Sequence, residues 1–104
     1  MDKKEFQIRD EIVEYLEKKG ILCWKDAKPL FSSKRGFAKS NGTPDILCVL
    51  KDGRFMGIEC KTKTGKLSKA QIDFIERISH TKAIFIVARE LDDVLRCLLK
   101  EKLI

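Results

Sequence analysis

Hydrophobic residues recur at helical spacing near the start of the chain. Ile8, Ile12 and Leu16 follow one another at intervals of four residues, so they form one stripe along the side of an α-helix. Gly20 follows the last turn, where a glycine commonly ends a helix. The pattern predicts a helix over residues 2–19 with one face on a core.

Three short apolar runs follow, with the length of β-strands rather than of helices. They occupy residues 21–24, 45–50 and 55–61. An Asp-Gly pair, typical of a tight turn, separates the second run from the third, so we expect an antiparallel hairpin there. The basic segment 25–41 lacks either periodicity and predicts a long loop.

The second half of the chain alternates helical and strand patterns. Ser68 and Gln71 match the S-x-x-Q capping box that begins many helices. Residues 83–88 form a continuous apolar run, as in a strand covered on both faces, and residues 91–103 predict a final helix. A strand reached through a crossover helix should lie parallel to the strand before that helix. The fold class is therefore α/β, a small mixed sheet flanked by helices, in a single domain over residues 1–104.

Composition narrows the functional classes. The net charge of +6 suits a polyanionic partner such as nucleic acid without requiring one. The four cysteines are scattered, with no Cys-x-x-Cys pair, and are expected to be buried reduced thiols. The charged N-terminus does not resemble a signal peptide, and no apolar run has the roughly 20 residues needed to cross a bilayer. We expect a soluble, intracellular (cytoplasmic) protein with no membrane partner.

A carboxylate pair and a lysine are the candidate chemistry. Asp45 stands at the mouth of the second strand, and Glu59 and Lys61 alternate along the third, so the latter two should share one face. Two carboxylates can hold a hard cation such as Mg²⁺, with Mn²⁺ as a substitute. Lys61 can orient a water molecule and stabilise charge in the transition state. The alternatives are an ordinary Pro-Asp turn for Asp45 and a structural ion pair between Glu59 and Lys61.

Two glycines and a proline surround these acids. Pro44 restricts the backbone that enters the strand ahead of Asp45. Gly42 is expected to let the backbone approach a ligand closely. Gly57, two residues before Glu59, is expected to leave space for a substrate or a metal ion.

The first helix should supply a further acid. At 100° per residue, Glu5 lies about 20° from Ile12, on the buried stripe, whereas Glu11 lies about 100° away. Glu5 is therefore the first choice and Glu11 the fallback. The alternative for Glu5 is an N-terminal capping box with Asp2.

Gln71 has two interpretations. As the third residue of its helix it can cap the backbone of Ser68, and on the inward face it can hydrogen-bond a metal-bound water or Lys61.

Basic residues cluster in two segments that are candidates for phosphate contacts, each of which adds nearly one unit to the salt dependence of binding. They are Lys25, Lys28, Lys34, Arg35 and Lys39 in the long loop, and Lys63, Lys66 and Lys69 after the third strand. Phe31 and Phe37 of the loop are either wedges between bases or core residues.

These motifs carry a family resemblance. A Pro-Asp pair followed by Glu-x-Lys on the next strand resembles the PD-(D/E)XK nuclease superfamily. Within it, the chain resembles the stand-alone VRR-NUC (virus-type replication-repair nuclease) domain, and more distantly the archaeal-type Holliday junction resolvases. The matching pieces are Glu5-x-Gln7-Ile8, Cys23-Trp24, Gly42-x-Pro44-Asp45, Glu59-x-Lys61 and Leu67-Ser68-x-x-Gln71.

The resemblance implies a restriction-endonuclease-like αβββαβ core with Glu5, Asp45, Glu59, Lys61 and Gln71 in the active site. It also implies a metal-dependent endonuclease that hydrolyses DNA, with branched or structured DNA as its substrate in replication, recombination or repair. The rivals are a DNA-binding module without catalysis and a nuclease that acts on RNA.

Resolvase-like relatives act as two-fold dimers, so a homodimer is expected. The apolar side of the final helix offers an interface for it, formed by Leu95, Leu98, Leu99 and Leu103.

Overall fold

The computed structural model describes residues 2–26 and 42–104, so most of the long predicted loop lies outside it. Within these ranges the elements follow the predicted order. They are α1 (Glu5–Lys18), β1 (Leu22–Lys25), β2 (Ile46–Val49), β3 (Phe55–Cys60), α2 (Lys69–Ile78), β4 (Ile84–Ala88) and α3 (Leu91–Lys100). None of the helices in the described part is long and apolar enough to span a membrane.

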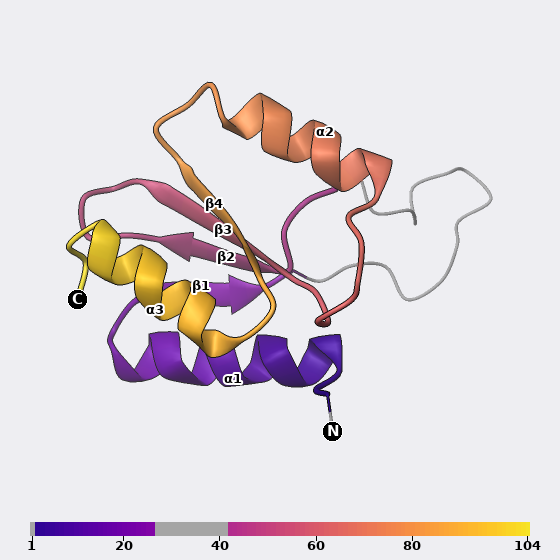
Figure 1. Ribbon diagram of the computed structural model, residues 1–104. Coiled ribbons are helices and arrows are strands. Elements are labelled where there is room, and N and C mark those ends of the chain that lie inside the picture. Colours follow the sequence, from indigo (N-terminus) through magenta and orange to yellow (C-terminus); the bar gives the residue numbers. More distant parts are fainter. Residues whose placement is uncertain (1, 27–41) are drawn as a thin grey trace.

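The four strands form one sheet in the order β1-β2-β3-β4 (Figure 1). Strands β1, β2 and β3 are antiparallel neighbours, and β2 is registered on β3 with Ile46 opposite Ile58. Strands β3 and β4 are parallel, with Ile58 opposite Ile86, and α2 is the crossover between them. The predicted mixed α/β sheet and its parallel last pair are confirmed.

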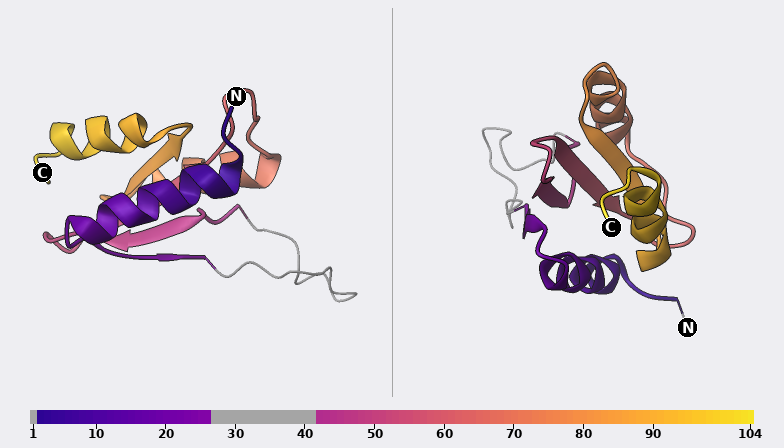
Figure 2. Two further views of the ribbon diagram at one scale, coloured as in Figure 1. Left: turned by 90° about the horizontal axis from the view of Figure 1, so that it is seen from below. Right: turned by 90° about the vertical axis from the view of Figure 1, so that its left-hand side faces the viewer.

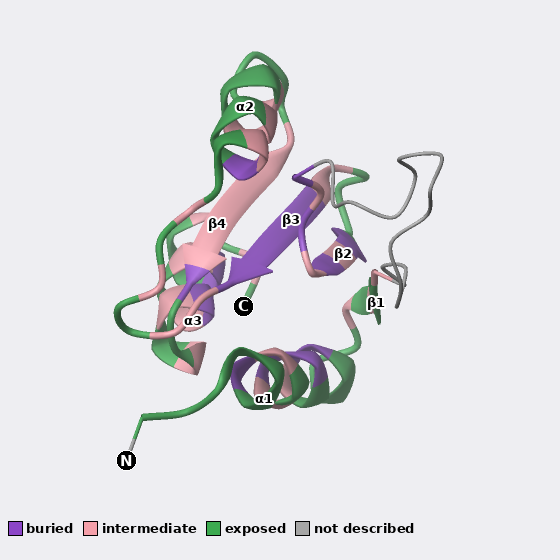
Figure 3. Cartoon of the chain, turned by 90° about the vertical axis from the view of Figure 1, so that its right-hand side faces the viewer, coloured by how far each residue is buried: buried purple, intermediate pink, exposed green. Residues whose placement is uncertain are grey.

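One face of the sheet carries the hydrophobic core. Ile46, Met56 and Ile58 alternate along their strands, are 0% exposed, and cluster with residues of α1 and α3 such as Ile12 and Leu98. The right-hand view of Figure 2 shows α1 and α3 on this side of the sheet and α2 on the other. In Figure 3 the buried colour runs along most of β3, the strand between β2 and β4.

The opposite face of β4 packs against α2. Phe85 contacts Phe74 of α2 with ring centroids 5.7 Å apart, whereas its neighbours Ile84 and Ile86 pack against the core on the other face. Strand β4 therefore has helices on both faces, as predicted. It is nevertheless only half-buried over most of its length, because it forms an edge of the sheet.

The helix ends follow from local backbone conformation. Gly20, with φ 74°, ends α1 as predicted, because a left-handed residue lets the following N–H groups close the last turn. Lys102, with φ 58°, has the same role after α3. Helix α3 consequently ends at Lys100, and the predicted helix over residues 91–103 was too long.

The apolar side of α3 packs mainly inside the chain. Leu98 is 0% exposed, Leu95 and Leu103 are half-buried, and Leu99 is 60% exposed. The core thus takes up most of the surface that was expected to form a dimer interface.

Candidate active site

Asp45 lies immediately before β2 and is fixed by hydrogen bonds. Its Oδ2 accepts from the backbone N–H of Cys60 at 2.8 Å. Its carbonyl oxygen accepts from the N–H of Asp26, also at 2.8 Å. The first bond ties the Asp45 carboxylate to the last residue of β3, directly beside Glu59 in the chain.

The two glycines near these acids make room for protein rather than for a ligand. A Cβ on Gly57 would lie 2.7 Å from Cγ of Pro44, and a Cβ on Gly42 would lie 2.1 Å from the carbonyl oxygen of Ala70. The expectations of space for substrate at Gly57 and for a ligand at Gly42 are therefore wrong. The Pro44 ring and the first turn of α2 fill those spaces, and both contacts position the segment that carries Asp45.

Glu59 is buried on β3, with 2% of its surface exposed. Its Oε2 accepts a hydrogen bond from Nε2 of Gln71 at 2.8 Å. Oε1 of Gln71 in turn accepts from the N–H of Ser68 at 2.8 Å, in the predicted capping box. Gln71 thus caps α2 and orients Glu59 at the same time. An amide donor orients a carboxylate without neutralising its charge.

Glu5, at the start of α1, lies close to Lys61. Its Oε1 is 4.0 Å from Nζ of Lys61, whose side chain is 13% exposed. The alternative capping box with Asp2 is wrong, because the N-cap of α1 is Lys4. Glu11, the fallback, is engaged in a surface ion pair. The contacts therefore favour Glu5 as the acid from the first helix.

Lys61 follows the end of β3 and extends toward α1. From the end of β3, Glu59 and Lys61 contact different helices. Glu59 contacts Gln71 of α2, whereas Lys61 contacts Glu5 of α1, and these helices cover opposite faces of the sheet. Strand β3 ends at Cys60, so the alternation of side chains does not fix residue 61.

The Cys60 thiol reports how closely these charged groups converge. Burial, followed by the negative charges of Asp45, Glu59 and Glu5, raises its pKa to about 12, while Arg9 acts in the opposite direction. The thiol stays protonated at neutral pH, so it is not a nucleophile. All three candidate acids lie within electrostatic reach of one side chain at the end of β3.

A pocket of about 200 Å³ opens beside this strand end, lined by Glu5, Phe6, Arg9 and Asp45. The sequence interpretation missed Phe6 and Arg9. At 100° per residue, Arg9 and Phe6 lie about 60° and 120° from Ile12, on the same side of the helix as Glu5. That signal was present in the sequence, but it becomes informative only once α1 is placed against Asp45.

The donor set suits a hard divalent cation. Within residues 2–26 and 42–104, no group of three or more His, Cys, Asp and Glu side chains is arranged to hold a metal ion. That part of the chain therefore does not form a closed zinc centre with four protein ligands. Mg²⁺ is different, because it is usually held by one or two carboxylates and completes its shell with water and phosphate oxygens. The carboxylates of Asp45 and Glu59 fit that requirement.

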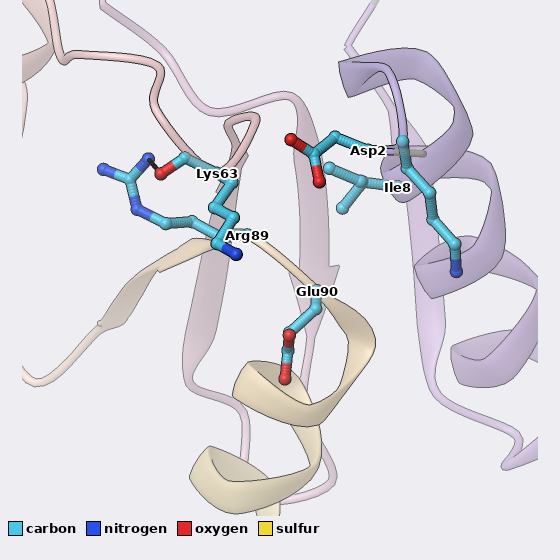
Figure 4. A pocket seen from close by; sticks show the side chains of 6 residues that line it. Asp2, Ile8, Lys63, Arg89 and Glu90 are labelled. Carbon is cyan, nitrogen blue, oxygen red and sulfur yellow. Dashed lines mark hydrogen bonds between the residues drawn. The ribbon is translucent and has the colours of Figure 1, made fainter.

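The loop after Lys61 is held by Arg89, a third residue that the sequence interpretation missed. Nη1 of Arg89 donates to the carbonyl oxygens of Thr62 at 2.6 Å and Gly65 at 2.8 Å. Arg89 and Lys63 also line a pocket of about 330 Å³ between this loop, the start of α1 and the start of α3 (Figure 4). No local motif marks Arg89, because its partners lie more than 20 residues away in sequence.

The predicted phosphate contacts are only partly visible. Lys63, Lys66 and Lys69 are exposed after β3. Lys25 is half-exposed and pairs with Asp10 at 2.7 Å. The remaining candidates lie outside the described residues. They are the basic residues Lys28, Lys34, Arg35 and Lys39, and the candidate wedges Phe31 and Phe37.

Comparison with known proteins shows the family to which this chain belongs. A sequence model of the VRR-NUC domain family matches residues 3–90, a range that includes every candidate site residue from Glu5 to Gln71. A solved structure described as a VRR_NUC domain is similar to this chain, with a TM-score of 0.68 and 25% sequence identity. The similarity covers 92% of this chain and 94% of that chain. No curated protein matches. The chain belongs to the VRR-NUC domain family and is a nuclease-type domain.

Proposed function

We propose that this protein is a Mg²⁺-dependent endonuclease that hydrolyses phosphodiester bonds of DNA. The observation that carries the proposal is the hydrogen bond from the Cys60 N–H to Asp45 Oδ2. It brings one carboxylate from the start of β2 to the end of β3, where Glu59 and Lys61 stand on either side of Cys60.

Asp45 and Glu59 are the residues that would hold the divalent ion. Such an ion, when bound, supplies Lewis-acid stabilisation of negative charge on the phosphate. Gln71 fixes Glu59, and the Cys60 N–H fixes Asp45, so neither carboxylate has to reorient during the reaction.

Lys61 is proposed to act on the reacting groups. Its ammonium donates hydrogen bonds to the attacking water and to a phosphate oxygen that gains charge in the transition state. Glu5, 4.0 Å away, keeps this ammonium at the end of the sheet. By the same chemistry we propose products with 5′-phosphate and 3′-hydroxyl ends, as the superfamily resemblance implies.

The substrate is proposed to be recognised by shape and backbone. A chain of 104 residues has little surface for reading a long base sequence. Exposed Lys63, Lys66 and Lys69 and the net charge of +6 suit contacts with phosphates. Branched or otherwise structured DNA is the proposed substrate in replication, recombination or repair. A homodimer is proposed because cutting two strands needs two sites.

Nicking of supercoiled plasmid tests the function. We expect nicking with Mg²⁺ or Mn²⁺ and none with EDTA, measured as conversion of supercoiled to open-circular DNA on a gel. The same reactions on a four-way junction, a flap, a linear duplex and a matched RNA identify the substrate class. Binding to DNA with no cutting under any metal condition would instead indicate a binding module, and cutting confined to RNA would overturn the proposed substrate.

A further inference from the structure

Phe6 is an exposed aromatic residue on the side of α1 that faces the candidate site. It is 52% exposed, whereas the buried residues of α1 are Ile8, Ile12, Val13 and Leu16. The core of the chain therefore does not account for a phenylalanine at this position. Phe6 lines one pocket with Glu5 and Asp45, which places its ring next to the candidate site.

The pocket that Phe6 lines offers complementary chemistry for a single nucleotide. Glu5, Arg9 and Asp45 are the other lining residues, and the volume is about 200 Å³. That is below the roughly 300–1,000 Å³ of sites for drug-sized ligands, so it suits one base rather than a base pair. An aromatic face binds a base by stacking, and a guanidinium binds phosphate in a planar, two-pronged geometry.

Arg9 is held in place at this pocket. Its Nε lies 3.1 Å from Oδ1 of Asp10, and the same carboxylate oxygen lies 2.7 Å from Nζ of Lys25 on β1. The Arg9 side chain is 33% exposed. A guanidinium fixed through its Nε keeps its two terminal nitrogens directed as a pair, which is the arrangement that phosphate requires.

We propose that this pocket binds an unpaired nucleotide next to the scissile phosphate. Phe6 stacks on the base of this nucleotide, and Arg9 binds its phosphate. A paired base inside a duplex has both faces covered by its neighbours, so Phe6 can reach only a base that has left the stack. The pocket therefore selects DNA with an unpaired nucleotide at the cleavage point, as found at junctions, flaps and bulges. The inference rests on the proposed nuclease function, because it places the nucleotide relative to that site.

A fluorescence experiment tests the inference without cleavage. A duplex carrying one unpaired 2-aminopurine, and a fully paired duplex of the same sequence, are titrated with the protein in EDTA. We expect wild type to quench the unpaired 2-aminopurine and to bind that DNA more tightly than the paired duplex. Phe6→Leu should no longer quench the unpaired 2-aminopurine, and its affinity for the unpaired DNA should fall about tenfold. Its affinity for the paired duplex should change less than about twofold. Phe6→Tyr should retain both properties.

Two further variants sharpen the result. Leu22→Ala, at a 63% exposed position of β1, is the control for removing an exposed apolar side chain elsewhere, and it should behave as wild type. Arg9→Gln should reduce the slope of log affinity against log salt by nearly one unit. The inference is overturned if Phe6→Leu binds and quenches as wild type does, or if it weakens both duplexes equally.

The experiments distinguish a failure of the nucleotide pocket from a failure of the proposed nuclease function. If wild type shows the Phe6-dependent quenching but cuts no DNA with Mg²⁺, the nucleotide pocket stands and the nuclease proposal falls. If wild type cuts DNA and Phe6→Leu cuts paired and unpaired substrates at wild-type rates, the nuclease proposal stands and the pocket assignment falls.

Discussion

Glu59→Gln is expected to lower Mg²⁺-dependent cleavage about a thousandfold while leaving the protein folded. The amide has the shape of the carboxylate and its oxygen can still accept the hydrogen bond from Gln71 Nε2, so packing at the 2% exposed position is conserved. The substitution removes the negative charge that would hold the ion. A loss of several kcal/mol in transition-state stabilisation corresponds to roughly a thousandfold in rate.

Single-turnover cleavage with Mg²⁺ measures the loss of activity. Thermal melting in EDTA measures the stability of the fold separately. Glu76→Gln is the matched control, because Glu76 lies on α2 with its side chain 73% exposed. We expect the control to cut as wild type does and both variants to melt within a few degrees of wild type. Cleavage by Glu59→Gln within about tenfold of wild type would remove Glu59 from the proposed chemistry.

The second large effect is expected at Gly42, where alanine should destabilise the fold by about 2–5 kcal/mol. Two costs add. The φ of 86° is a left-handed conformation that costs an L-residue about 1–2 kcal/mol. The new Cβ would also lie 2.1 Å from the Ala70 carbonyl oxygen, and this overlap with helical backbone adds about 1–3 kcal/mol.

Gly53→Ala separates the two costs. Gly53 has a φ of 90°, but a Cβ there would meet nothing within 4 Å. Urea unfolding should therefore show a loss of about 1–2 kcal/mol for Gly53→Ala and a clearly larger loss for Gly42→Ala. Equal losses would mean that the contact between Gly42 and the first turn of α2 contributes nothing to stability.

Most of the fold was predictable because its determinants are local. The stripe of Ile8, Ile12 and Leu16, the terminator Gly20 and the capping box at Ser68 each act within a few residues, and the structure confirms all of them. The parallel pairing of β3 and β4 followed from the crossover rule. The end of α3 was missed because it depends on a lysine, Lys102, in a conformation that usually needs glycine.

The candidate site was predictable only where the spacing of residues along the sequence indicates which side chains come together. The Asp45 carboxylate reaches the end of β3, where Glu59 precedes Cys60, because a short hairpin joins the two strands, and that hairpin was visible in the sequence. The contact between Glu5 and Lys61 depends on how α1 docks on the sheet. The Pro44 ring over Gly57 likewise depends on tertiary packing, and spacing alone suggested an empty space there.

The residues missed altogether share one physical reason. Arg89 acts on carbonyl groups of a distant loop, and Phe6 and Arg9 acquire meaning only from the pocket that they form with Asp45. Local periodicity alone does not reveal such contacts between distant segments.

Binding of Mn²⁺ is the most direct measure of the central claim, that Asp45 and Glu59 together hold a divalent cation. Titration followed by the electron paramagnetic resonance signal of free Mn²⁺ requires no substrate and no cleavage. Asp45→Asn and Glu59→Gln should each weaken binding at least about tenfold, whereas Asp73→Asn, at an exposed position of α2, should bind as wild type does. Unchanged Mn²⁺ affinity in both site variants would contradict the account, because the ion would then be held elsewhere.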